Sequence, residues 1–88
     1  MVGAWYDDQE QLLNGLPVPT RFTEAGWPPI PIVARLVWES GEKYVDTVAE
    51  AWTRAAVLVE QLDPRSPFRG VWIPAEDVVR RRRGPSQQ

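Results

Sequence analysis

Residues 43–62, Lys43-Tyr-Val-Asp-Thr-Val-Ala-Glu-Ala-Trp-Thr-Arg-Ala-Ala-Val-Leu-Val-Glu-Gln-Leu62, decide the fold of this 88-residue chain, because they fit two structures. As a helix, they place apolar residues three or four positions apart along one face. That face consists of Val45, Val48, Trp52, Ala55, Val59 and Leu62. As strands, residues 44–48 pair back across a turn at Gly41, and residues 56–59 form a further strand. The periodicity favours the helix, whereas the turn and the Val57-Leu-Val59 run favour a sheet, so the residues alone leave both open.

The segment before it, residues 32–38, is predicted to be a strand. It is rich in β-branched residues, and Ala34, Leu36 and Trp38 alternate onto one face while Arg35 faces the other. A turn over residues 39–42 follows, with glycine at a permissive position.

The C-terminal part is predicted to contain short elements. Residues 70–73 read as a strand, residues 74–77 as one turn of 3₁₀ helix that begins with a proline, and residues 78–79 as a last strand. Arg80, Arg81, Arg82 and Arg83 follow, and residues 82–88 are predicted to be a disordered basic tail. Residues 32–81 would then form one small domain.

The N-terminal part, residues 1–31, is predicted to be an arm. Acidic residues near Asp7 and a glycine at Gly15 favour a short helix within residues 5–15, and an irregular arm that orders on a partner is the alternative. Five prolines in residues 16–31 predict an extended, polyproline-like connection. Trp27 is the expected anchor of this connection on its own domain.

Several short motifs carry a resemblance. They are Ala34-Arg-Leu-Val-Trp-Glu39, Gly41-Glu42, Ala51-Trp-Thr53, Val57-Leu-Val59 and Gly70-Val-Trp-Ile-Pro-Ala-Glu-Asp-Val78 with an arginine after it. Together they resemble short uncharacterised proteins of actinobacteria and their phages. The resemblance implies a succession of short strands with a 3₁₀ turn near the end, as in a small SH3-like barrel, and no enzyme activity.

The resemblance favours a mainly β fold, a small SH3-like barrel or curled antiparallel sheet with a short N-terminal helix and a proline-rich arm. An α+β fold with a long helix over residues 43–62 is the alternative. The helix-favouring run Val48-Ala-Glu-Ala51 departs from the strand interpretation.

Composition excludes several kinds of chemistry. The chain has no cysteine and no histidine, which rules out disulfides, Cys/His zinc sites and imidazole catalysis. Its acidic pairs have no calcium-loop spacing, and its glycines form no phosphate loop. We therefore expect no enzyme activity, no cofactor, no metal site and no small-molecule substrate. No signal-peptide pattern or membrane-spanning run is present, so a cytoplasmic protein is expected, in the host cytoplasm if a phage encodes it.

Charge and tryptophan content point to binding. Residues 1–63 carry ten acids and four bases, whereas residues 64–88 carry two acids and six bases. Tryptophan and arginine are over-represented among interface hot spots. The expected function is a protein-interaction or self-assembly module, with a protein partner or a second copy as ligand. The alternative is a nucleic-acid-binding barrel that uses the arginine run. The candidate partner-binding residues are Trp5, Trp27, Trp72, Arg80, Arg81, Arg82 and Arg83.

Overall fold

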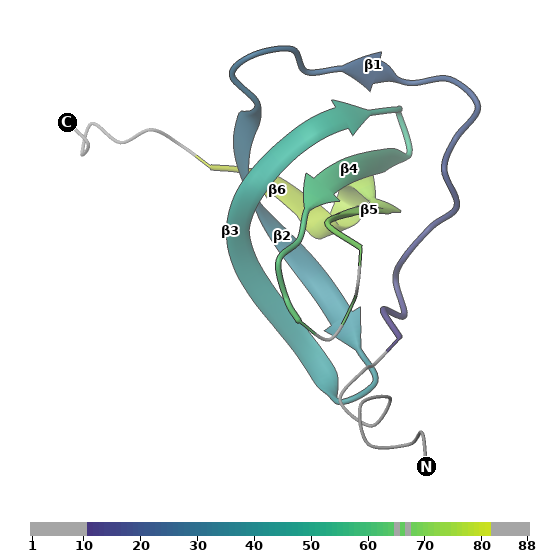
Figure 1. The fold of residues 1–88 in the computed structure, drawn as a ribbon, viewed down its shortest axis with the longest axis vertical. Helices are drawn as coiled ribbons and strands as arrows, with labels where there is room; N and C mark the ends of the chain where they lie inside the picture. Colours follow the sequence, from purple (N-terminus) through teal and green to yellow (C-terminus); the bar gives the residue numbers. More distant parts are fainter. Residues whose placement is uncertain (1–10, 65, 67, 82–88) are drawn as a thin grey trace, which may run out of the picture.

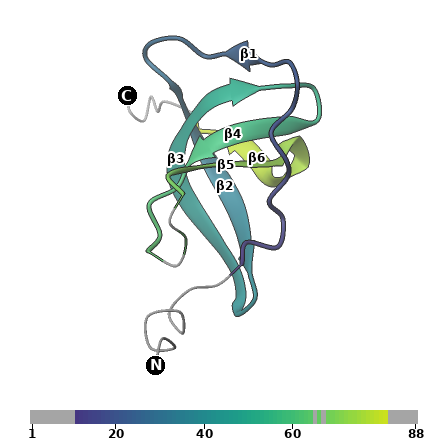
Figure 2. The same cartoon turned by 45° about the vertical axis from the view of Figure 1, so that its right-hand side comes forward.

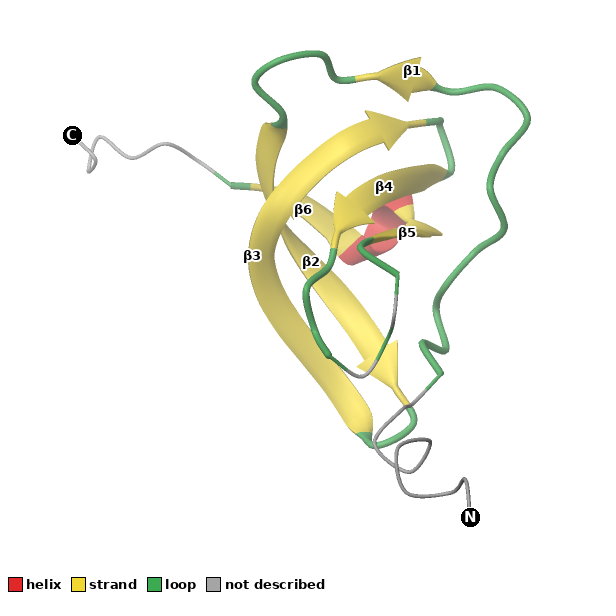
Figure 3. Ribbon diagram, in the orientation of Figure 1, coloured by secondary structure: helices red, strands yellow, loops and turns green. Residues whose placement is uncertain are grey.

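The computed structural model describes residues 11–64, 66 and 68–81. Within them the chain is mainly β and forms one curled antiparallel sheet (Figures 1 and 3). Its elements are β1 (Thr23–Glu24), β2 (Ile30–Trp38), β3 (Gly41–Trp52), β4 (Ala56–Glu60), β5 (Gly70–Pro74), the 3₁₀ turn η1 (Ala75–Asp77) and β6 (Val78–Arg80). The strand order is β5-β4-β3-β2-β6, and β1 adds to β3.

The ambiguous stretch is sheet, so the long helix over residues 43–62 is wrong. β3 pairs with β2 along nine residue pairs, from Ile30 opposite Ala49 to Trp38 opposite Gly41. A two-residue connection joins them, and Gly41 adopts a φ of 138°, which glycine tolerates best. Residues 41–49 of β3 therefore each lie opposite a residue of β2. This pairing overrides the local helix propensity.

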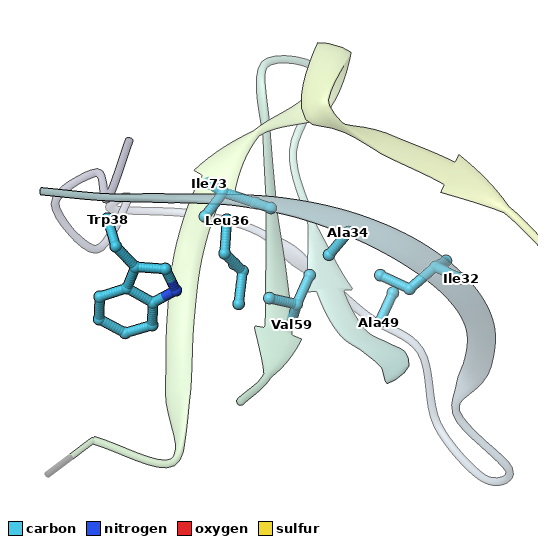
Figure 4. Packing of buried hydrophobic residues seen from close by; sticks show 7 residues of the cluster. All are labelled: Ile32, Ala34, Leu36, Trp38, Ala49, Val59 and Ile73. Carbon is cyan, nitrogen blue, oxygen red and sulfur yellow. The ribbon is translucent and has the colours of Figure 1, made fainter. Parts of the chain in front are cut away.

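β2 confirms the predicted alternation. Ile32, Ala34, Leu36 and Trp38 are all buried, and the residues between them are not. They pack with Ala49, Val59 and Ile73 into the main core, whose seven side chains gather between the strands in Figure 4. This cluster lies on the concave face of the curled sheet, which we call the inner face.

The predicted helix over residues 5–15 is wrong for its described part, residues 11–15; residues 5–10 lie outside the described residues. Leu12 instead forms an isolated bridge with Trp38, and the Leu13 N–H donates to the Val37 carbonyl at 2.6 Å. The Asn14 side chain continues this pairing, because its amide donates to the Arg35 carbonyl at 2.9 Å and accepts from the Val37 N–H at 3.0 Å. Residues 12–14 therefore act as a strand substitute on the edge of β2 that β6 leaves uncovered.

The arm continues around the sheet from there. Figures 1 and 2 show residues 11–22 running beside the strands up to β1, which lies next to the end of β3. Leu16 donates its N–H to the Trp72 carbonyl of β5 at 2.7 Å, and β1 pairs Thr23 with Trp52. The arm is extended, as its prolines predict, and is attached at three places along the sheet.

The last two predicted elements are confirmed. The 3₁₀ turn spans Ala75–Asp77 directly after Pro74, and β6 pairs antiparallel with β2, with Ala34 opposite Val78 and Ile32 opposite Arg80. The predicted basic tail, residues 82–88, lies outside the described residues.

Candidate interaction groove

A β-bulge gives the sheet a second apolar surface. Ala49 pairs with Val59, but Ala51 pairs with Leu58, so Glu50 is an extra residue in β3. Residues directly opposite each other in a sheet share a face. Ala51 therefore joins Leu58 on the outer, convex face, whereas Ala49 and Val59 stay on the inner face.

The outer face carries its own small cluster. Ala51, Ala56 and Trp72 are buried there, with Leu58 packed against them. Phe22 of the arm covers Trp72, with ring centroids 5.2 Å apart and the planes tilted by 55°. Such tilted aromatic pairs are favourable, so the arm's packing on the outer face centres on this contact.

Beside this contact lies an open groove of about 420 Å³. The sheet contributes three lining residues, and the arm contributes five. The lining residues are Phe22, Glu24, Gly26, Trp27, Pro29, Glu50, Ala51 and Leu58. The arm therefore covers only part of the outer apolar surface, and the remainder faces this groove.

Trp27 stands at this groove almost entirely in solvent, with 89% of its surface exposed. Gly26 before it has a φ of 78°, a conformation that favours glycine, and the Trp27–Pro28 peptide bond is cis. The prediction that Trp27 anchors the arm to its own domain is wrong, because 89% of the residue's surface is exposed. Phe22 performs the anchoring instead.

The groove is acidic. Glu24 and Glu50 both line it and both are exposed. Among residues 11–64, 66 and 68–81, neither carboxylate forms an ion pair. A second groove of about 330 Å³ lies beside the first half of β3. That groove contains a cation, because Lys43 lines it and pairs with Asp63 at 3.6 Å. The Trp27 groove thus combines apolar surface with two carboxylates available to a cation.

Arg35 is the centre of a separate polar network. It donates to Glu42 and, at 3.0 Å, to Asp77, whose carboxylate also accepts from Asn14 at 3.0 Å. The side-chain hydrogen bonds to Glu42 and Asp77 raise the pKa of Arg35 above its ordinary value. The guanidinium stays charged at any ordinary pH, and this network links the arm, β2, β3 and η1.

The predicted binding residues fall in different places. Trp27 lies at the groove, whereas Trp72 is only 5% exposed and lies beneath Phe22. Arg80 is exposed on β6, and Arg81 pairs with Asp46 at 3.2 Å. Trp5, Arg82 and Arg83 lie outside the described residues.

Of the residues that line the groove, sequence reasoning predicted only Trp27 as a binding residue. Phe22, Glu24 and Glu50 carry no motif, and only the bulge and the return of the arm bring them together. The sole local signal is the Gly26-Trp27-Pro28-Pro29 stretch, whose glycine and prolines favour a turn, and from the sequence Trp27 was expected to anchor this stretch on its own domain.

Within the described part of the chain, no cluster of three or more acidic, histidine or cysteine side chains could hold a metal ion. No helix in that part is long and apolar enough to span a membrane. Comparison of the chain with protein-family models, with curated proteins and with solved structures finds no match.

Proposed function

We propose that this protein is a non-enzymatic interaction module that binds an extended, basic segment of another protein in the Trp27 groove. The observation that carries the proposal is Trp27 itself, 89% exposed at a groove that the protein's own side chains leave open. A tryptophan this exposed contributes nothing to the core, and tryptophans beside a pocket are typical interface hot spots.

The shape of the groove supports an extended ligand. Its lining runs from Phe22 and Trp27 of the arm to Ala51 and Leu58 of the sheet, so apolar side chains could pack between two aromatic rings. Grooves lined by aromatics recognise extended, proline-containing segments because these lose little entropy on binding.

The charge of the groove favours a basic ligand. Glu24 and Glu50 have no ion pair among the described residues, so an arginine or lysine gains two carboxylates without displacing another cation. The same carboxylates repel phosphate, which is why we favour a protein over a nucleic acid. Of the two described arginines of the run, Arg81 is already paired with Asp46.

A random-peptide display library, selected on the purified protein, tests this function. We expect the selected peptides to be rich in arginine or lysine together with proline or aliphatic residues. Trp27→Ala should weaken the binding of a selected peptide by about 30-fold or more, the loss of about 2 kcal/mol typical of a hot-spot tryptophan.

Tyr44→Ala is the matched control, since Tyr44 is 63% exposed on β3 but does not line the groove. It should leave the affinity unchanged. A failure to select any peptide, or equal affinities for the Trp27 and Tyr44 variants, would contradict the proposal. Salt-dependent binding of a DNA duplex that Arg80→Ser and Arg81→Ser remove would support the nucleic-acid alternative instead.

A further inference from the structure

The described chain ends close to the groove and points along β2 toward it. Arg80 lies opposite Ile32, and the Arg81 N–H donates to the Pro31 carbonyl at 3.0 Å. β6 is antiparallel to β2, so at Arg81 the chain runs toward the first residues of β2. Pro29, which lines the groove, lies only two residues before Pro31.

The remaining length is sufficient to reach the groove. Two residues of extended chain span about 7 Å, which separates Pro31 from Pro29 along the strand. Residues 82–88 number seven, and seven residues span up to about 23–25 Å when extended.

The chemistry of this segment is complementary to the groove. Arg82 and Arg83 could each approach one of the carboxylates of Glu24 and Glu50, and a guanidinium can also stack on an exposed indole such as Trp27. Pro85 follows as an apolar residue.

We propose that residues 82–88 of the same chain occupy the Trp27 groove and compete there with an outside partner. The proposal rests on the proposed function, because it assigns an intramolecular ligand to the same binding surface. A tethered ligand has an effective concentration in the millimolar range for a short connection, so weak intrinsic affinity suffices to fill the groove. An outside partner then has to displace the arginine run before it binds.

A spin label on the intact chain tests this placement directly. The chain has no cysteine, so Ser86→Cys gives a single attachment site for a nitroxide. We expect the label to broaden the NMR signals of the Gly26 amide, the Trp27 indole and the Ala51 amide, compared with the same sample after reduction of the nitroxide. Glu24→Gln combined with Glu50→Gln should abolish this broadening, and added salt should weaken it.

Glu39→Gln combined with Glu76→Gln is the charge-matched control, because both residues are exposed and neither lines the groove. This variant should retain the broadening. Signals of the groove that are unaffected by the label would overturn the proposal. Broadening that appears only when spin-labelled chains are mixed with isotope-labelled chains would also overturn it, because the tail would then dock on a second copy.

The result of the spin-label experiment is independent of the test of the proposed function. The spin label reports where residues 82–88 lie, whereas the peptide selection and the Trp27→Ala variant report whether the groove binds a partner. A groove that binds selected peptides but shows no broadening would leave the function standing without this intramolecular ligand.

Discussion

The two faces of the sheet bury apolar side chains in different ways. On the inner face, strands β2 to β5 curl around seven buried residues, which include the fully buried Leu36 and Ile73. On the outer face, Ala51, Ala56 and Trp72 are buried, and Phe22 of the arm packs on Trp72. Most of the cover of the inner face comes from the strands, with Leu12 of the arm packed against it, whereas the outer face depends on Phe22 of the arm.

This difference explains why the open groove lies on the outer face. Phe22 packs on the Trp72 ring, Leu16 bridges the Trp72 backbone, and apolar surface beside the Phe22 contact remains open as the groove. A face covered by a separate segment can be covered in part, as the open groove beside Phe22 shows. Substitutions on the two faces should therefore lower the free energy of unfolding by different amounts.

The largest expected effect belongs to the inner face. Leu36→Ala should lower the free energy of unfolding by about 2–5 kcal/mol, because it leaves a cavity among residues that cannot collapse onto it. Urea denaturation followed by tryptophan fluorescence measures the change. Leu62→Ala is the control, since Leu62 is largely exposed, and it should change the value by no more than about 0.5 kcal/mol. Equal losses in the two variants would show that Leu36 does not belong to a closed core.

An intermediate effect is expected where the arm is attached to β2. Asn14→Ala removes both hydrogen bonds that its side chain makes to the backbone of Arg35 and Val37, and should cost about 1–3 kcal/mol. The Val37 amide should also exchange its hydrogen faster. Thr20→Ala, at an exposed position of the same arm, should leave that amide unchanged. Unaltered exchange at Val37 in the Asn14 variant would contradict the strand-substitute role.

A smaller effect is expected on the outer face. Phe22→Ala should cost about 1 kcal/mol, in the range of an aromatic pair, because Phe22 is already 42% exposed. The indole signal of Trp72 should shift in the NMR spectrum as its cover is removed. Val18→Ala, at a more exposed position of the arm, is the control. A loss as large as that of Leu36→Ala would mean that the outer face is as closed as the inner one.

The smallest effect on stability is expected at the groove. Trp27→Ala should change the free energy of unfolding by no more than about 0.5 kcal/mol, because the side chain packs on so little of its own domain. The same variant should lose binding of the selected peptides, so stability and function separate at this residue. A marked loss of stability would show that the indole supports the fold and would weaken its assignment to a partner.

The sequence predicted the inner face far better than the outer one. The alternation of Ala34, Leu36 and Trp38 is a property of consecutive residues, and it was confirmed. The helical spacing within residues 43–62 does not correspond to one face of the sheet, because Val45 lies opposite Ala34 on the inner face and Val48 lies opposite Pro31 on the other face. The bulge at Glu50 also has no direct sign in the sequence.

The groove could be predicted only through one residue. The turn at Gly26-Trp27-Pro28 is a local signal, and the structure places Trp27 at the groove. The carboxylates of Glu24 and Glu50 come from separate strands, and their meeting depends on the pairing of β1 with the end of β3. Two other predicted residues have contacts within the protein: Arg81 pairs with Asp46, and Trp72 lies under Phe22 of the arm.

The position of β2 has a consequence for the newly made chain. One neighbour of β2 is the next strand along the sequence, but its other neighbour is β6, the last described strand. During synthesis, residues Ile32–Ala34 of β2 therefore stay unpaired on the β6 side until almost the whole domain has emerged. An unpaired strand edge can pair with other chains. The adjoining part, at Arg35 and Val37, has no such delay, because Leu13 and Asn14 precede it in the sequence and can cover it as soon as β2 forms.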